Sequence, residues 1–132
     1  QIASVVSRCL EAVFGEDAYG FRIDFERKRG QTEAKLVLLR DDLELDDPKD
    51  QVGGGVLDVC GFALRLACLV LSRPPKRKLL ILDEPAKWLN GRDYRRRFCE
   101  LLLALAQEMR VQIIMTTNSP DFMVGKIVEL EG

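Results

Sequence analysis

In residues 1–40 the hydrophobic residues follow two spacings. At the start of the chain they recur every three to four positions, which predicts an amphipathic helix; these positions are Ile2, Val5, Val6, Cys9, Leu10 and Val13. In "FRIDFERK", residues 21–28, apolar and polar residues alternate, as they do in a half-buried strand. The residues "RGQ" then turn the chain into "TEAKLVLLR", a second strand. This part of the chain is therefore predicted to form a helix followed by an antiparallel hairpin.

The rest of the chain alternates helical and strand-like apolar segments. Residues 41–53 are acidic, include Pro48 and are predicted to form a loop. An almost wholly apolar helix follows from Gly54 to Leu71, where the prolines of "RPPKRK" end it. "LLIL" predicts a buried strand, "RDYRRRFCELLLALAQEM" a helix, "VQIIMTT" a second buried strand and "KIVEL" a third. Apolar strands separated by a helix predict an α/β fold with a parallel sheet that is covered on both faces.

Composition narrows the class of protein and its chemistry. The 132 residues are 47% hydrophobic and 31% charged, as in one globular domain, and the formal net charge of −1 gives no general reason to expect nucleic-acid or membrane binding. The chain has no histidine, which removes the commonest zinc ligand and general base. Its four cysteines have neither metal-ligand spacing nor the density of a secreted disulfide framework, so a reducing, cytoplasmic setting without membrane association is expected.

Charge is nonetheless grouped along the chain. "DDLELDDPKD" is acidic, whereas "RPPKRK" and "RDYRRR" are basic. Such groups usually form solvated faces. Clustered arginines also contact DNA phosphates, so "RDYRRRF" is either the solvated face of the following helix or a DNA contact.

The apolar run "LLIL" ends directly in two adjacent carboxylates, Asp83 and Glu84. In open parallel sheets, ligands bind beyond the carboxyl ends of the strands, where these acids are expected. One carboxylate can hold a hydrated Mg²⁺ ion, and its neighbour can orient or deprotonate a water that attacks a phosphoryl group. The next apolar strand ends in "TTN", which is expected to place Thr117 and Asn118 beside the acids. The alternative is that the strand simply ends in a solvated turn, and that the two acids have no catalytic or metal-binding role.

Three consecutive glycines, Gly53, Gly54 and Gly55, precede the apolar helix. Their accessible N–H groups at a helix N-terminus form either an anion site or a flexible hinge. Asp58, one turn further on, complements the helix dipole and says nothing about ligands. The chain contains no G-x-x-x-x-G-K-[ST] phosphate loop, so its acid pair is expected to belong to only part of a nucleotide site.

Three motifs in this order, "VGGGV", "ALRLA" and "LLILDEP", resemble the C-terminal lobe of ABC-type ATPase heads, and most of all those of SMC proteins and double-strand-break-repair exonuclease ATPases. The resemblance implies a P-loop NTPase-like α/β fold with parallel core strands after an N-terminal helix and antiparallel hairpin. Residues 1–132 would form one domain, with the helix and hairpin in 1–51 and the signature helix, Walker B strand, D-loop and switch strand in 52–132. The chain begins at Gln1 and lacks a Walker A lobe, so a fragment of a longer protein is expected.

The resemblance assigns nucleotide contacts to two segments. Gly53, Gly54 and Gly55 occupy the signature position, and "AKWLN" corresponds to the D-loop, which ends at Asn90. This chain departs from the family at both places, since Gly53 stands where the family has serine and Asn90 where it has aspartate. A contact from Gly53 to the γ-phosphate would therefore come from backbone N–H groups.

The resemblance also implies the catalytic residues. Asp83 would bind Mg²⁺ through its water shell, Glu84 would orient the attacking water, and Asn118 would stand at the switch position, where the family usually has histidine. An asparagine can hydrogen-bond a phosphate oxygen but cannot carry positive charge. A slow or partner-dependent ATPase is expected, with this chain inactive on its own.

The family's mode of action implies cofactors and partners. Two heads sandwich ATP and Mg²⁺, each offering its signature motif to the nucleotide held by the other's phosphate loop. The expected partners are therefore a Walker A lobe, a second head, DNA and, in the exonuclease branch, a nuclease subunit. The first helix would be the inner end of a coiled-coil arm, and the location would be cytoplasmic, associated with the nucleoid in a bacterium or phage.

Two other interpretations stay open from the sequence. "IIMTTNSPD" is similar to the sensor strand of an AAA+ ATPase, but that class needs a phosphate loop about 50 to 60 residues before Asp83, and residues 23–33 contain none. The second interpretation is a non-catalytic structural or DNA-binding module that keeps an ATPase fold. The lost phosphate loop favours it, and the intact pair of Asp83 and Glu84 argues against it.

Overall fold

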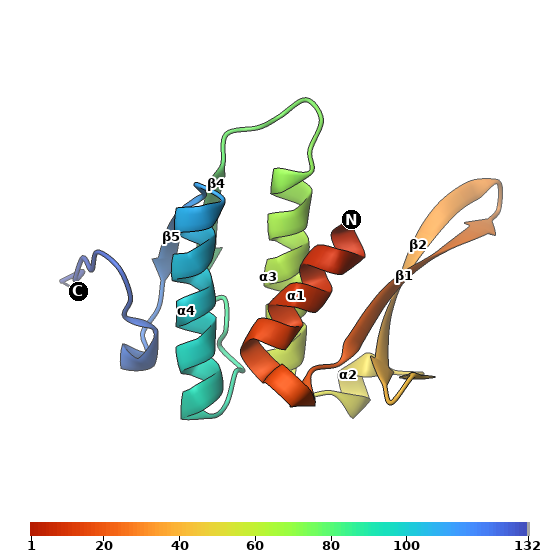
Figure 1. Ribbon diagram of the computed structural model, residues 1–132, viewed down its shortest axis with the longest axis horizontal. Helices are drawn as coiled ribbons and strands as arrows, with labels where there is room; N and C mark the ends of the chain where they lie inside the picture. The colour runs from red at the N-terminus through yellow and green to blue at the C-terminus, as the bar shows by residue number, and fades with distance from the viewer. Residues whose placement is uncertain (132) are drawn as a thin grey trace.

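The computed structural model describes residues 1–131, and its N-terminal part is a helix followed by an antiparallel sheet (Figure 1). The predicted helix is α1 (Ile2–Phe14), which a single 3₁₀ turn (Gly15–Asp17) connects to the sheet. The predicted hairpin is formed by β1 (Gly20–Lys28) and β2 (Gln31–Arg40), in a register that pairs Phe21 with Leu38. The outer half of this hairpin extends away from the helices (Figure 1).

The segment predicted to be a loop, residues 41–53, contains two short elements. One is β3 (Leu43–Glu44), which pairs with the end of β2, and the other is the four-residue helix α2 (Pro48–Gln51). The long apolar helix follows as α3 (Gly54–Val70).

The C-terminal part contains a parallel pair of strands with a helix between them, as predicted. These elements are β4 (Leu79–Asp83), α4 (Arg92–Glu108) and β5 (Gln112–Thr116). In the register of β4 and β5, Leu80 lies opposite Ile113 and Asp83 lies opposite Thr116. A second 3₁₀ turn (Pro120–Phe122) follows β5.

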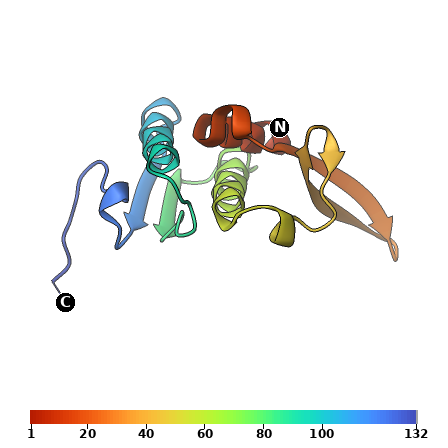
Figure 2. The same cartoon turned by 90° about the horizontal axis from the view of Figure 1, so that it is seen from below.

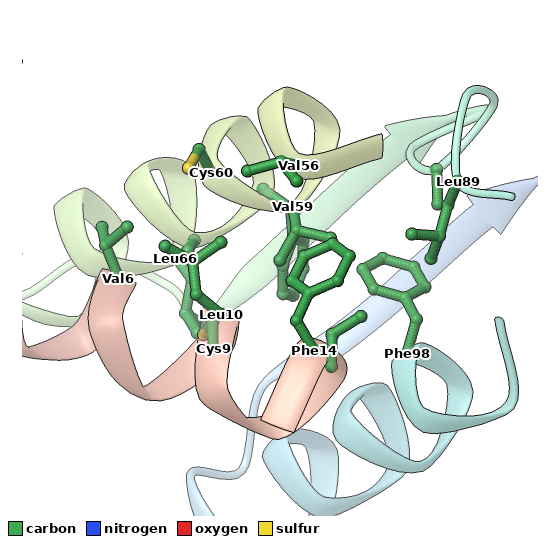
Figure 3. Close-up of a cluster of buried hydrophobic side chains, with 14 of the residues drawn as sticks. Val6, Cys9, Leu10, Phe14, Val56, Val59, Cys60, Leu66, Leu89 and Phe98 are labelled. Carbon is green, nitrogen blue, oxygen red and sulfur yellow. The ribbon is translucent and has the colours of Figure 1, made fainter. Parts of the chain in front are cut away.

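One hydrophobic core joins α1, α3, α4 and the inner face of β4 (Figure 3). Leu10 of α1 and Leu66 of α3 are fully buried where these helices pack together. Phe62 of α3 meets Phe98 of α4 edge to face, with ring centroids 5.4 Å apart. Edge-to-face contacts add to the stabilisation from burying the two rings. The core therefore fixes α3 and α4 relative to each other. It also fixes β4, the strand that carries the acids.

Two sequence predictions about the sheet are wrong. Residues 126–130, "KIVEL", form no strand, and the parallel sheet has only β4 and β5 within residues 1–131. The sheet is also covered on one face only, because α4 packs over one side and no described element packs over the other (Figures 1 and 2). Ile81 is consequently 72% exposed and Ile114 48% exposed, although Leu80 and Leu82 on the inner face are buried.

Among residues 1–131, no helix combines the length and the apolar character that a membrane crossing requires.

Replacing Phe98 by alanine tests the core. The side chain is 0% exposed and contacts Phe62 and Phe122, so Phe98→Ala is expected to lower the free energy of unfolding by about 3–5 kcal/mol. Leu103→Ala, on the exposed face of the same helix, is the matched control and is expected to cost well under half as much. Urea unfolding followed by circular dichroism measures both, and similar losses would contradict the assigned core.

Candidate functional site

Asp83 is the last residue of β4, and a side chain of β5 orients its carboxylate. The parallel register places Thr116 opposite Asp83, and the Thr116 hydroxyl donates a hydrogen bond of 2.7 Å to Asp83 Oδ1. Asp83 itself is exposed. One carboxylate oxygen is thus held by the neighbouring strand, while the group as a whole faces solvent at the carboxyl end of the sheet.

Glu84 continues the chain beyond β4 in an unusual backbone conformation. Its φ of 44° lies in the left-handed region, which costs a non-glycine residue about 1–3 kcal/mol and persists only where the surroundings hold it. The surroundings here are the segment after β5. The Glu84 N–H donates to the Thr116 carbonyl at 3.0 Å, and Glu84 Oε1 accepts a 2.7 Å hydrogen bond from the Asn118 N–H. The backbone amide of Asn118, rather than its side chain, therefore orients Glu84.

Thr117 completes the contacts of the acid pair. Its hydroxyl donates a long hydrogen bond of 3.4 Å to Glu84 Oε2 and accepts one of 3.1 Å from the Ser119 N–H. The expectation that "TTN" would lie beside the acids is confirmed for Thr117 and Asn118. Thr116 was missed as a partner of Asp83, although the paired apolar strands "LLILD" and "QIIMT" contained the signal, because aligning them as parallel neighbours puts Thr116 opposite Asp83.

The glycines before α3 permit a close approach of the loop that follows Glu84. A Cβ atom on Gly54 would lie 2.8 Å from the Cβ of Trp88, and one on Gly55 would lie 2.9 Å from the Cα of Leu89. These distances are shorter than contacts between real Cβ atoms and their neighbours. Gly54 and Gly55 therefore have a packing role that the sequence predictions, an anion site or a hinge, did not include.

Asp58 holds the same loop from the next turn of α3. Its Oδ2 accepts a hydrogen bond of 2.8 Å from the Trp88 N–H. Burial raises the pKa of the Asp58 carboxyl, and the hydrogen bond from Trp88 acts in the opposite direction. The sequence assigned Asp58 only to the helix dipole, and nothing in the local pattern pointed to an amide 30 residues away.

Gly53 and Asn90 flank the residues that form this contact: Gly53 precedes Gly54, and Asn90 follows Leu89. Gly53 is the N-cap of α3, is exposed, and would meet nothing within 4 Å if it carried a Cβ atom. Asn90 is exposed and follows Leu89, which is buried. The close approach of Gly54 to Trp88 brings together the two segments that contain the predicted nucleotide contacts Gly53 and Asn90.

Arg95 links the end of this loop to the segment after β5. Its Nε donates to the Leu89 carbonyl at 2.7 Å, and its guanidinium forms an ion pair of 2.6 Å with Asp121. The guanidinium also lies over the ring of Phe122. Sequence reasoning grouped Arg95 with the solvated arginines of "RDYRRR" and missed this link, which depends on a contact 26 residues away.

A pocket of about 230 Å³ lies between the acid pair and α3. Asp58 and Arg65 of α3 line it together with Asp83 and Glu84. Mg²⁺ commonly binds through one carboxylate and keeps several waters, so the exposed Asp83 carboxylate fits this ion. Among the side chains that the structure describes, no group of three or more Asp, Glu, His or Cys is placed to hold a metal. The remaining ligands of Mg²⁺ would have to be water or phosphate oxygens.

Comparison with known proteins gives a fold but no family. No family model and no curated protein matches the chain. Solved structures do resemble it, and two of them each share 15% identity over 92% of this chain. One is an SMC head bound to the C-winged-helix domain of ScpA, with a TM-score of 0.68, and the other belongs to work on ATP-driven dimerization and DNA-stimulated activation of SMC ATPases, with a TM-score of 0.66.

The likeness shows that this chain has the same fold as part of the SMC heads in these structures. The chain spans 35% of the length of the first structure and 70% of the second. It therefore corresponds to part of the length of such a protein.

Gly55 provides a test of the loop contact, with Gly61 as a control in the same helix. Gly55→Ala would push a methyl group against the Leu89 backbone, whereas at Gly61 a Cβ atom meets nothing within 4 Å. Alanine at Gly61, in the helix interior, gains up to about 1 kcal/mol of helix propensity, and a difference larger than this gain reports the clash at Gly55. We expect Gly55→Ala to be less stable than Gly61→Ala by about 1–3 kcal/mol.

The measurement is urea unfolding of both variants, followed by hydrogen exchange of the Trp88 amide. The urea unfolding is followed by tryptophan fluorescence, which reports on this loop because Trp88 is the sole tryptophan of the chain. Faster exchange of the Trp88 N–H in Gly55→Ala is expected, because the displaced loop loses its hydrogen bond to Asp58. Identical stability and exchange in the two variants would contradict the packing role of Gly55.

Proposed function

We propose that the chain supplies the signature motif and the Walker B acids of an ATP-hydrolysing head similar to those of SMC proteins. The observation that carries the proposal is the support of Glu84, whose strained backbone directly follows β4 and whose carboxylate accepts a 2.7 Å hydrogen bond from the Asn118 N–H. A carboxylate in a solvated turn needs no such support.

In this proposal each acid has a separate task. Asp83 binds the Mg²⁺ of MgATP, and the ion neutralises the charge of the phosphates during phosphoryl transfer. Glu84 orients the attacking water and accepts its proton. Thr116 and the Asn118 backbone hold the two carboxylates, and the exposed Gly53 and Asn90 face the nucleotide of a second head.

The head needs a second lobe that carries the Walker A phosphate loop, and the bare sheet supports its presence. Ile81 and Ile114 are exposed on the uncovered face. A space of about 870 Å³ lies beside β5, between α4 and the segment from Phe122 to Leu130. An exposed apolar sheet face of this kind marks a surface that another part of a protein covers.

The further partners follow from the same likeness to SMC heads. A second head would complete the ATP sandwich, DNA would be the substrate that the assembly holds, and a nuclease subunit would join it if the parent belongs to the exonuclease branch. The similarity to SMC heads favours this function over an AAA+ fragment. The supported carboxylates favour it over a non-catalytic module.

Glu84→Gln tests the catalytic role. The chain alone is expected neither to bind nor to hydrolyse MgATP, and to gain hydrolysis when the Walker A lobe of its parent protein is supplied. In that complex Glu84→Gln should lower kcat about 10²- to 10⁴-fold with little change in nucleotide binding, since the amide cannot accept the proton. Glu11→Gln, an exposed carboxylate on α1, is the control and should leave kcat unchanged.

Two results would contradict the proposal. Hydrolysis that persists in Glu84→Gln would exclude the role of Glu84. Tight MgATP binding by the isolated chain would exclude the idea that these residues form only part of the nucleotide site.

A further inference from the structure

The end of the sheet opposite the acids carries a cluster of exposed cations. The loop from α3 to β4 contributes Arg73, Lys76, Arg77 and Lys78, and the turn from α4 to β5 contributes Arg110. We call these five residues the basic edge. All five are exposed, and the loop extends beyond the ends of α3 and α4 (Figure 1).

Hydrogen bonds hold the two segments of the basic edge together. The Lys78 carbonyl accepts a hydrogen bond of 2.9 Å from the Gln112 N–H, and the Lys78 ammonium donates one of 3.2 Å to the Met109 carbonyl. Pro74 and Pro75 restrict the backbone of the loop between α3 and β4. The cations are therefore arranged on a defined surface although the two segments lie more than 30 residues apart in sequence.

Among the side chains that the structure describes, no ion pair involves the basic edge. The ion pairs of the described residues involve other cations, on the hairpin and on the outer face of α4. Residues 71–82 contain no aspartate or glutamate. Cations near helix C-termini interact favourably with the last carbonyls, which accounts for Lys78, but Lys76 and Arg77 have no such contact.

We propose that the basic edge binds the phosphate backbone of double-stranded DNA. Exposed lysines and arginines without counterions release condensed ions from DNA and gain affinity without reading the sequence. Residues 72–78 contain no aromatic side chain on which an unpaired base could stack, so a duplex fits better than a single strand. They also contain no large apolar residue apart from the two prolines, whereas protein interfaces usually have an apolar centre.

The binding surface lies at the end of the sheet remote from Asp83 and Glu84, so the proposal does not depend on ATP hydrolysis. It also differs from the DNA contact considered for "RDYRRRF", where Arg96 is paired with Glu100 and Arg95 with Asp121. If the chain proves not to take part in ATP hydrolysis, the proposed DNA binding is unaffected. If it does not bind DNA, the proposed ATPase role is unaffected.

The test is fluorescence anisotropy with a labelled 30-base-pair duplex of mixed sequence, without nucleotide, over a range of salt concentrations. For the unmodified chain the logarithm of affinity should fall linearly with the logarithm of salt. Lys76→Ala/Arg77→Ala should weaken binding about tenfold or more at 0.1 M salt. The slope of log affinity against log salt should become shallower by the amount expected for the loss of about two phosphate contacts. Circular dichroism melting checks that the variant is folded, which is expected because both side chains are exposed.

The matched control is Arg92→Ala/Arg96→Ala on α4, which lowers the formal net charge from −1 by the same two units. It should change affinity much less than the basic-edge variant. Three outcomes would overturn the proposal: equal losses in the two variants, unchanged affinity in Lys76→Ala/Arg77→Ala, or binding of a single strand or a poly-glutamate peptide at least as tight as that of the duplex.

Discussion

The arrangement of the candidate site depends on one close contact, in which the loop after Glu84 lies directly on the glycines that begin α3. Gly54 and Gly55 have no side chains to keep Trp88 and Leu89 away, and any Cβ atom there would come within 3 Å of them. Asp58 then fixes the loop with a hydrogen bond to the Trp88 amide. Because β4 leads directly into this loop, the contact ties the N-terminus of α3 to the strand that carries the acids.

The parallel register of β4 and β5 supplies the second constraint. It places Thr116 opposite Asp83, and the chain beyond β5 then brings the Asn118 amide to Glu84. The left-handed backbone of Glu84 would relax without these partners. Strained backbone conformations cluster at functional sites, where the strain can keep a group oriented before a ligand arrives. The two constraints together fix both carboxylates relative to the start of α3.

Much of this architecture could be predicted from local patterns. The period of the apolar residues gave α1 and α4, the alternation in "FRIDFERK" gave the hairpin, and the spacing of the apolar strands placed "TTN" beside the acids. What failed depended on neighbours that a pattern does not reveal. "KIVEL" has the composition of a strand, but a strand also needs a partner for its backbone groups, and residues 126–130 have none in the described chain. The hydrogen bonds of Asp58 and Arg95 join residues far apart in sequence, so they became visible only in the fold.

The net charge of −1 conceals an uneven distribution of charge over the molecule. Two carboxylates lie at the carboxyl end of the parallel strands, and at the opposite end lie five cations that form no ion pair with a described side chain. Over a Debye length of about 8 Å at physiological salt, a ligand at one end is largely screened from charges at the other. A polyanion at the basic edge therefore meets a strongly positive surface, while the acid pair can attract a metal ion independently. The fold can hold the acid pair and the basic edge together because they lie at opposite ends of β4. In addition, α3 and α4 both end at the basic edge, and cations are favoured at the C-termini of helices.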